Sequence, residues 1–420
     1  MTNQRFSKMS EMTQHDLLKR SWEEPDEKSR APFPSWMRSD PMWELETDDF
    51  IRAEWRKMSV TEQRGRVMPT GRVQVYESKR NVTIHIPDSE MFSHEIMTIM
   101  ATAFQLTIFS MDQMRALTGF EPDRLDRLLT RLYRGGYIAK CSGHTAGNFS
   151  DIWSFDYKSR VAPAWLNRLP PDIRLLVTGG EVIDSAPPGS MSASSIRHDL
   201  VMNELMLRVL ELSDNVAGFW GDPFLDAARL YTASDDEVKR ASHGDGAIVS
   251  KNGKIVMFEL VGAGLSGSNW ERTRLKAASW AAIAGASEFD ISVVFVSLNY
   301  MRDWKGLISA VHKGCNDVGL FTPNSAAIRR GRNKIGVVSA SRLMPELGVS
   351  STAINGIDVW SPWRGESFSA LNEPDSTVTG LERAVPTINT VAALHTPRWL
   401  HNELVDRNEK LLVRREDEDS

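Results

Sequence analysis

The chain has 420 residues, of which 41% are hydrophobic and 25% charged, and its formal net charge is −5. This composition is typical of a globular protein with about two or three domains, and it excludes a polycation that binds nucleic acid through its overall charge. Two cysteines exclude a disulfide framework, and the scattered histidines form no zinc-binding pattern. We find no secretory signal or membrane-spanning run, so we expect a cytoplasmic protein without membrane contacts.

Residues 1–70 are rich in charge and interrupted by proline, which indicates an extended arm without a core of its own. Disordered tails seldom carry several indoles, so we expect the arm to dock on a globular surface, with a passive tail as the alternative. The indoles belong to Trp22, Trp36, Trp43 and Trp55.

Residues 71–160 are expected to form a β-hairpin followed by a winged helix-turn-helix. Apolar residues alternate with polar ones around residues 73–75 and 82–86, which predicts the two strands of the hairpin. Helical periodicity follows from residue 96, Ser110 can cap a second helix, and a third helix begins near Pro122. The stretches "YIAK" and "IWSFD" then predict two strands around a polar tip.

The third of these helices carries the predicted DNA contacts. Its polar side is rich in arginine, which suits both phosphates and guanine edges. We expect double-stranded DNA as the partner, contacted by Arg124, Arg127, Arg131, Arg134 and Lys140. The alternative is a winged helix that binds protein, in which Asp123 and Asp126 pair with the arginines along the helix.

Residues 161–365 predict a mixed α/β domain, because helices and apolar strands alternate in the order α-β-β-α-β-α. Residues 366–420 predict a linker and a last helix with an acidic end. In the helix before the first strands, Arg197, Glu204, Arg208 and Glu211 share one face. We expect Glu204 to be solvated, with a third metal ligand as the alternative. His198 and Asn203 lie among apolar neighbours, where a lone histidine is usually a buried core residue.

Two carboxylates in this domain stand where a metal-dependent nuclease would hold a metal ion. Asp245 begins one predicted strand and Glu259 lies in the next, so the two carboxylates can meet and offer oxygen ligands to Mg²⁺. A nuclease of this type also carries a lysine two residues after the second carboxylate, where this chain has Val261. Only Lys276 in the next helix can replace it. We therefore expect a degenerate site without a cofactor, in which Glu259 pairs with Lys276 or Arg274.

These segments together resemble the replication-relaxation family of actinobacterial and Gram-positive plasmids, phages and integrative elements. The resemblance rests on "RHDLVMNEL", "DGAI" and "FELVGAGLSGSNWERTRLKAASW" and covers residues 93–300. It implies a winged helix joined to a restriction-endonuclease-like α/β domain. Family members often carry an acidic residue where this chain has Val261. The matched positions are His198, Asn203, Asp245, Glu259, Arg274 and Lys276.

The sequence thus predicts a DNA-binding protein of a mobile element or phage that acts in replication, transfer or regulation and forms a homo-oligomer. One alternative is a metal-dependent endonuclease that uses Asp245, Glu259 and Lys276. Another is an assembly protein whose N-terminal arm clasps a neighbouring subunit.

Overall fold

The computed structural model has helices together with one antiparallel and one mixed sheet, which confirms a mixed α/β class. The predicted arm at residues 1–70 lies outside the described residues, as does the predicted C-terminal helix. The described residues are 76–77, 84–142, 152–156, 159–169, 193–213, 215–221, 225, 244–250, 254–261, 265–287, 289–298, 300–343 and 356–371.

The chain divides into two compact units, Met1–Glu204 and Leu205–Ser420. The division falls inside the long helix α12 (Ala193–Leu212), whereas the sequence analysis began the second domain at residue 161. The physical reason is that the first part of α12 is bonded to the first unit. The side chain of Gln113 donates a hydrogen bond of 2.7 Å to the carbonyl of Leu200.

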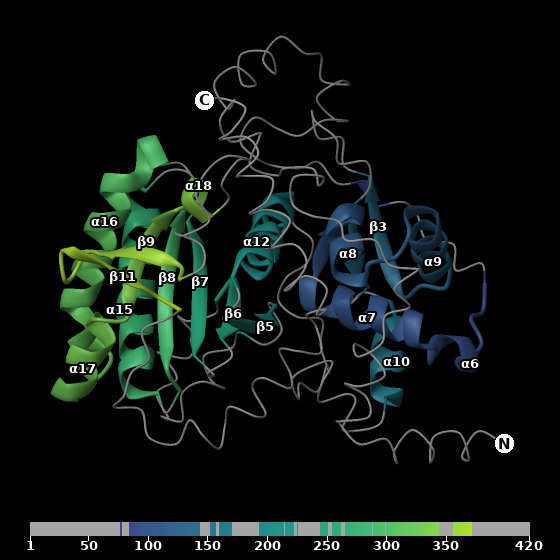
Figure 1. Cartoon of the computed structure of the whole chain (residues 1–420), viewed down its shortest axis with the longest axis horizontal. Helices are drawn as coiled ribbons and strands as arrows, with labels where there is room; N and C mark the ends of the chain where they lie inside the picture. The colour runs from purple at the N-terminus through teal and green to yellow at the C-terminus, as the bar shows by residue number, and fades with distance from the viewer. Residues whose placement is uncertain are drawn as a thin grey trace, which may run out of the picture. The chain divides into compact units, whose positions relative to one another are not determined.

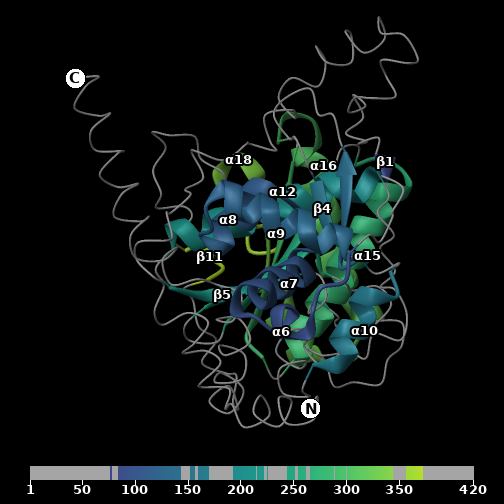
Figure 2. The same cartoon turned by 90° about the vertical axis from the view of Figure 1, so that its right-hand side faces the viewer.

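The first unit combines helices with short strands (Figures 1 and 2). Helix α8 (Met111–Thr118) begins and ends where the sequence predicts: Ser110 and Gln113 form a reciprocal capping box, and Gly119 ends the helix with a left-handed φ of 66°. The elements are α6 (Asp88–Met91), α7 (His94–Leu106), β2 (Ile108–Ser110), α8 (Met111–Thr118), α9 (Pro122–Arg134), β3 (Ile138–Ser142), β4 (Ile152–Phe155) and α10 (Val161–Arg168).

The strands of this unit form an antiparallel sheet in the order β1-β3-β4-β2. The hairpin predicted around residues 73–86 is not found in the part of this segment that the structure describes. Instead, β1 (Tyr76–Glu77) pairs with β3, and residues 84–87 are irregular. The alternating pattern did identify an extended segment, but its partner comes from about 65 residues later in the chain, which local periodicity cannot reveal.

The second unit contains a seven-stranded mixed sheet in the order β11-β10-β9-β8-β7-β6-β5. Strands β5, β6 and β7 form an antiparallel meander, β8 and β9 continue parallel to β7, and β10 and β11 are antiparallel again. The strands are β5 (Val216–Trp220), β6 (Gly246–Ser250), β7 (Ile255–Val261), β8 (Ile291–Ser297), β9 (Ile335–Ser339), β10 (Asp358–Ser361) and β11 (Glu366–Ser369).

Helices pack on the sheet of the second unit (Figure 1). Helix α15 connects β7 to β8 and packs against α16 and α17. Alternate residues of the strands, such as Met257, Val293 and Val337, join Trp280 and Leu307 in one buried core. The helices are α15 (Ser268–Ala286), α16 (Tyr300–Asp317), the short 3₁₀ helix η3 (Val318–Leu320), α17 (Ser325–Arg332) and α18 (Ala340–Leu343).

Strand β11 corrects the prediction that a linker begins at residue 366. It pairs with β10 along its whole length and closes the sheet at that edge, and Phe368 is only 6% exposed. No described helix is both long and apolar enough to cross a membrane.

Candidate functional site

The two predicted carboxylates face each other across the meander of the second unit. Asp245 lies one residue before β6, and its backbone N–H donates to the carbonyl of Phe258 in β7. Its carboxylate accepts a hydrogen bond of 2.6 Å from the backbone N–H of Leu260. Glu259 stands between these two partners, so the antiparallel register brings the carboxylates together as the sequence analysis expected.

Glu259 is buried, and both of its oxygens are bonded to side chains of α15. The ammonium group of Lys276 lies 2.5 Å from Oε2, and the indole N–H of Trp280 donates to Oε1 at 2.5 Å. Lys276 and Trp280 are four residues apart and therefore lie on one face of the helix. Position 261 carries a valine, and the lysine beside Glu259 comes instead from Lys276 of α15.

Trp280 belongs to this site, although the sequence patterns did not predict it. A signal was present, because Trp280 follows Lys276 by one helical turn and the alanine-rich stretch around it marks a buried face. Arg274, the other predicted partner of Glu259, points elsewhere and pairs with Glu271 and Asp317.

The charges in this site are strongly coupled. Burial and the neighbouring Asp245 carboxylate raise the pKa of Glu259 to about 7, although the bonds to Lys276 and Trp280 oppose that shift. Burial lowers the pKa of Lys276, but the Glu259 and Asp245 carboxylates outweigh it and hold that pKa above its usual value. Two nearby carboxylates and one lysine therefore form an arrangement that carries a surplus of negative charge when all three are ionised.

The two carboxylates fit a hard divalent cation in charge and in ligand type. Asp245 and Glu259 would hold Mg²⁺, which lowers the pKa of bound water and stabilises charge on a phosphodiester. Lys276 would add a positive charge beside them. The described residues bring no third histidine, cysteine or acidic side chain into a metal-binding group.

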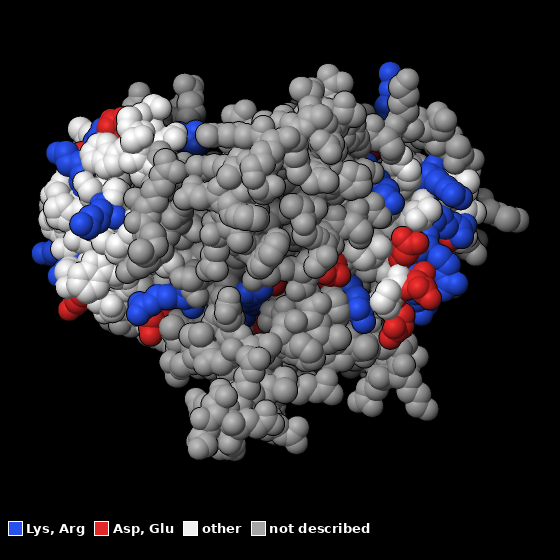
Figure 3. Space-filling model, turned by 90° about the horizontal axis from the view of Figure 1, so that it is seen from above, with Lys and Arg blue, Asp and Glu red and all other residues white. Residues whose placement is uncertain are grey.

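The predicted DNA-contacting arginines of the first unit fall into two classes. Arg124 pairs with Glu95 of α7, and Arg131 lies 2.6 Å from Glu90 of α6. Figure 3 shows blue side chains along the right-hand edge of this view with red ones beside them. The acidic partners come from α6 and α7, whereas the sequence analysis considered Asp123 and Asp126 on α9 itself.

Arg127 and Arg134 form the second class. Both side chains are exposed on α9, and neither forms an ion pair with any residue that the structure describes. Lys140 in β3 places its ammonium group 4.9 Å from the centre of the Trp153 ring, an arrangement that stabilises the cation against the aromatic face.

The prediction that Glu204 is solvated is wrong, because the polar face of α12 on which it lies is buried. Glu204 and Glu211 are 0% exposed and Arg208 is 6% exposed. A helical wheel cannot distinguish a polar face in water from a polar face whose charges are satisfied inside the protein. The side chain of Arg197 lies outside the described residues.

The two polar residues of α12 that the family resemblance singled out differ in environment. Asn203 is buried and donates hydrogen bonds to the carbonyls of Leu106 and Ile108. His198 is about one third exposed and lies 3.2 Å from Asp199, so it is not a core residue.

Comparison with protein-family models, with curated proteins and with solved structures found no match to this chain. The resemblance to the replication-relaxation family therefore stays a prediction.

Proposed function

We propose that this chain binds double-stranded DNA through helix α9 of its first unit. The order α7-β2-α8-α9-β3-β4, with β2 paired to β4, supports this proposal, because a winged helix-turn-helix has the same order and places its third helix in the major groove. The main observation for this proposal is that α9 has a buried apolar face and an exposed basic face. Leu125, Leu129 and Leu132 are buried, while Arg127 and Arg134 are exposed.

The geometry of α9 suits contacts with a duplex. A guanidinium group can donate two parallel hydrogen bonds to a guanine edge or to a phosphate. Glu90 and Glu95 partly neutralise the neighbouring arginines, which limits non-specific attraction to the DNA backbone. The resemblance stated above supports a role in replication, transfer or regulation of a mobile element or phage, with a homo-oligomer as the acting form.

The test is fluorescence anisotropy with a labelled pool of random duplexes, repeated at several salt concentrations. Arg127→Ala combined with Arg134→Ala should weaken binding by about 1–3 kcal/mol per base-contacting arginine. The matched control, Arg272→Ala with Arg342→Ala, removes the same charge from exposed positions of the second unit and should have little effect. Equal losses in both variants, or no loss in either, would overturn the role of α9.

A second candidate function is metal-dependent cleavage of a phosphodiester at Asp245, Glu259 and Lys276. The observation that favours it is the 2.5 Å contact of Lys276 with Glu259, because it supplies the charge that Val261 cannot. The order of an antiparallel meander, a helix and a parallel strand also matches that of a restriction-endonuclease-like domain. Such a fold would present the two carboxylates to the metal and Lys276 to the phosphate.

Nicking of supercoiled DNA tests this candidate in Mg²⁺ and in Mn²⁺. The candidate predicts nicking by the wild type that is lost in both Asp245→Asn and Glu259→Gln and is retained in Asp317→Asn, which alters a carboxylate on α16. Absence of nicking in the wild type would leave the Lys276–Glu259 pair with a structural role only.

A further inference from the structure

A pocket of about 740 Å³ lies in the second unit, at the end of the sheet away from Glu259. Its wall includes Lys254, which directly precedes β7, and Lys334, which directly precedes β9. Ser292, near the start of β8, also lines it. Strands rise about 3.3 Å per residue, so Lys254 lies roughly 16 Å along β7 from Glu259. The pocket is therefore separate from the carboxylate site.

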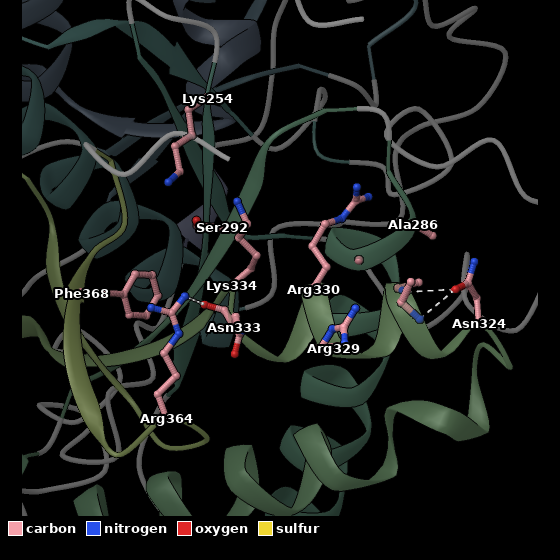
Figure 4. A pocket seen from close by; sticks show the side chains of 13 residues that line it. Lys254, Ala286, Ser292, Asn324, Arg329, Arg330, Asn333, Lys334, Arg364 and Phe368 are labelled. Carbon is pink, nitrogen blue, oxygen red and sulfur yellow. Dashed lines mark hydrogen bonds between the residues drawn. The ribbon is translucent and has the colours of Figure 1, made fainter. Parts of the chain in front are cut away.

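Five cationic side chains line this pocket, and no acidic side chain joins them among the described lining residues. Figure 4 shows the amines of Lys254 and Lys334 turned toward the side where Ser292 lies, with arginines completing the wall. The cations come from separate segments of the chain, so the fold gathers them. They are Lys254, Arg329, Arg330, Lys334 and Arg364.

Part of this positive charge has partners in the protein. The ammonium group of Lys334 lies 2.5 Å from Asp290, and Arg364 lies 3.8 Å from Glu366. Arg329 and Arg330, by contrast, have no acidic partner within the part of the chain that the structure describes.

Arg330 has a structural role that accounts for only one of its donors. Its Nη2 donates a hydrogen bond of 2.8 Å to the carbonyl of Ser287, just after α15 ends. The Nε–H of the same side chain is buried and finds no acceptor among the described residues. A buried donor without an acceptor destabilises the protein, so the unpaired N–H indicates that a ligand supplies the acceptor.

Ser292 supplies an independent observation on the same pocket. Its side chain is 0% exposed, and its hydroxyl has no hydrogen-bond partner among the described residues. A hydroxyl and a guanidinium N–H that both lack acceptors, within a ring of cations, match a ligand that is anionic and rich in acceptor oxygens.

We propose that this pocket binds a phosphate group, carried either by a free nucleotide or by the phosphorylated end of a nucleic-acid strand. A phosphate presents several acceptor oxygens in different directions, which suits cations on several sides better than a planar carboxylate does. The cavity is larger than a phosphate ion and lies within the range of about 300–1,000 Å³ that is usual for small-molecule pockets. The proposal does not depend on DNA binding by α9.

Isothermal titration calorimetry on the full chain tests this proposal, with pyrophosphate, ADP and adenosine as probes in a phosphate-free buffer. We expect pyrophosphate or ADP to bind and adenosine not to bind. A second arm compares an oligonucleotide that carries a 5′-phosphate with the same strand ending in a 5′-hydroxyl. Binding of ADP but no preference for the 5′-phosphate identifies a free nucleotide, whereas a clear preference for the 5′-phosphate identifies a strand end.

Three variants make the result specific to the pocket. Arg329→Gln and Ser292→Ala should each weaken binding of the successful probe, and Arg329→Gln combined with Arg330→Gln should weaken it at least about tenfold, as loss of charge-assisted bonds implies. The control, Arg272→Gln with Arg342→Gln, removes two exposed charges outside the pocket and should leave binding unchanged. The proposal is overturned if no probe binds at millimolar concentration, or if the control weakens binding as much as the pocket variants do.

Discussion

The ammonium group of Lys276 and the carboxylate of Glu259 form a 2.5 Å ion pair in which the glutamate is only 3% exposed. Removing the lysine would leave a buried carboxylate next to Asp245, with the Trp280 indole as its only side-chain donor among the described residues. We expect Lys276→Met to lower the free energy of unfolding by about 3 kcal/mol at pH 8, above the pKa of about 7 of Glu259, because the buried carboxylate then loses its counter-charge. Chemical denaturation of the isolated variant measures this change.

Two further variants separate this effect from a general loss of charge. Lys313→Met removes a lysine that is 57% exposed and pairs with Asp317, so it should cost less than about 1 kcal/mol. Glu259→Gln combined with Lys276→Met should recover much of the lost stability, because it removes the stranded charge. A Lys276→Met effect no larger than that of Lys313→Met would contradict the prediction.

The raised pKa of Glu259 predicts a pH dependence of stability. The folded state holds a proton on Glu259 up to a pKa of about 7, whereas the unfolded chain releases it near the ordinary value of 4.5. Between these values the folded state binds more protons, so this group should lower stability as the pH rises from about 4.5 to 7. One pKa unit corresponds to about 1.4 kcal/mol, so the shift from 4.5 to about 7 should cost about 3 kcal/mol of stability. Denaturation across this range, with metal chelated, should show a flatter profile for Glu259→Gln than for the wild type. Parallel profiles would contradict it.

Asn203 holds the turn between α7 and β2. Its amide donates to the carbonyls of Leu106 and Ile108, on either side of Thr107, whose φ of 59° is unusual for a β-branched residue. We expect Asn203→Ala to lower the free energy of unfolding by about 1–3 kcal/mol, because two buried carbonyls lose a donor. Asn316→Ala, in an exposed side chain of α16, is the control and should change stability by less than about 0.5 kcal/mol. Equal effects would exclude the bracing role of Asn203.

Local signals in the sequence were sufficient for several elements of the first unit. Ser110 and Gly119 mark the ends of α8 through capping chemistry, and the leucine spacing of α9 identifies its buried face. These features depend on residues within a few positions of one another, so they can be predicted from a short stretch of sequence. The pairing of Asp245 with Glu259 was also predictable, because a short connection between strands fixes their register.

Other features depend on contacts between distant segments. The sequence suggests that Lys276 can supply the positive charge that is absent at Val261. Only the packing of α15 on the sheet decides whether Lys276 or Arg274 reaches Glu259. The burial of Glu204 was missed because polarity along a helix does not report what covers it. The basic pocket was missed altogether, because its cations are spread over about 110 residues of sequence.

Helices α15 and α17 approach each other closely at Gly285 and Gly331. A Cβ atom on Gly331 would lie 1.8 Å from the carbonyl oxygen of Ala281, so α17 would have to move away from α15. We expect Gly331→Ala to lower the free energy of unfolding by about 1–3 kcal/mol, as overpacking does in other cores. Gly319→Ala is the matched control, because its Cβ would find its nearest neighbour at 3.7 Å. Thermal and chemical denaturation should therefore separate the two variants, and a Gly331→Ala protein as stable as the Gly319→Ala protein would show that the helices do not meet at this glycine.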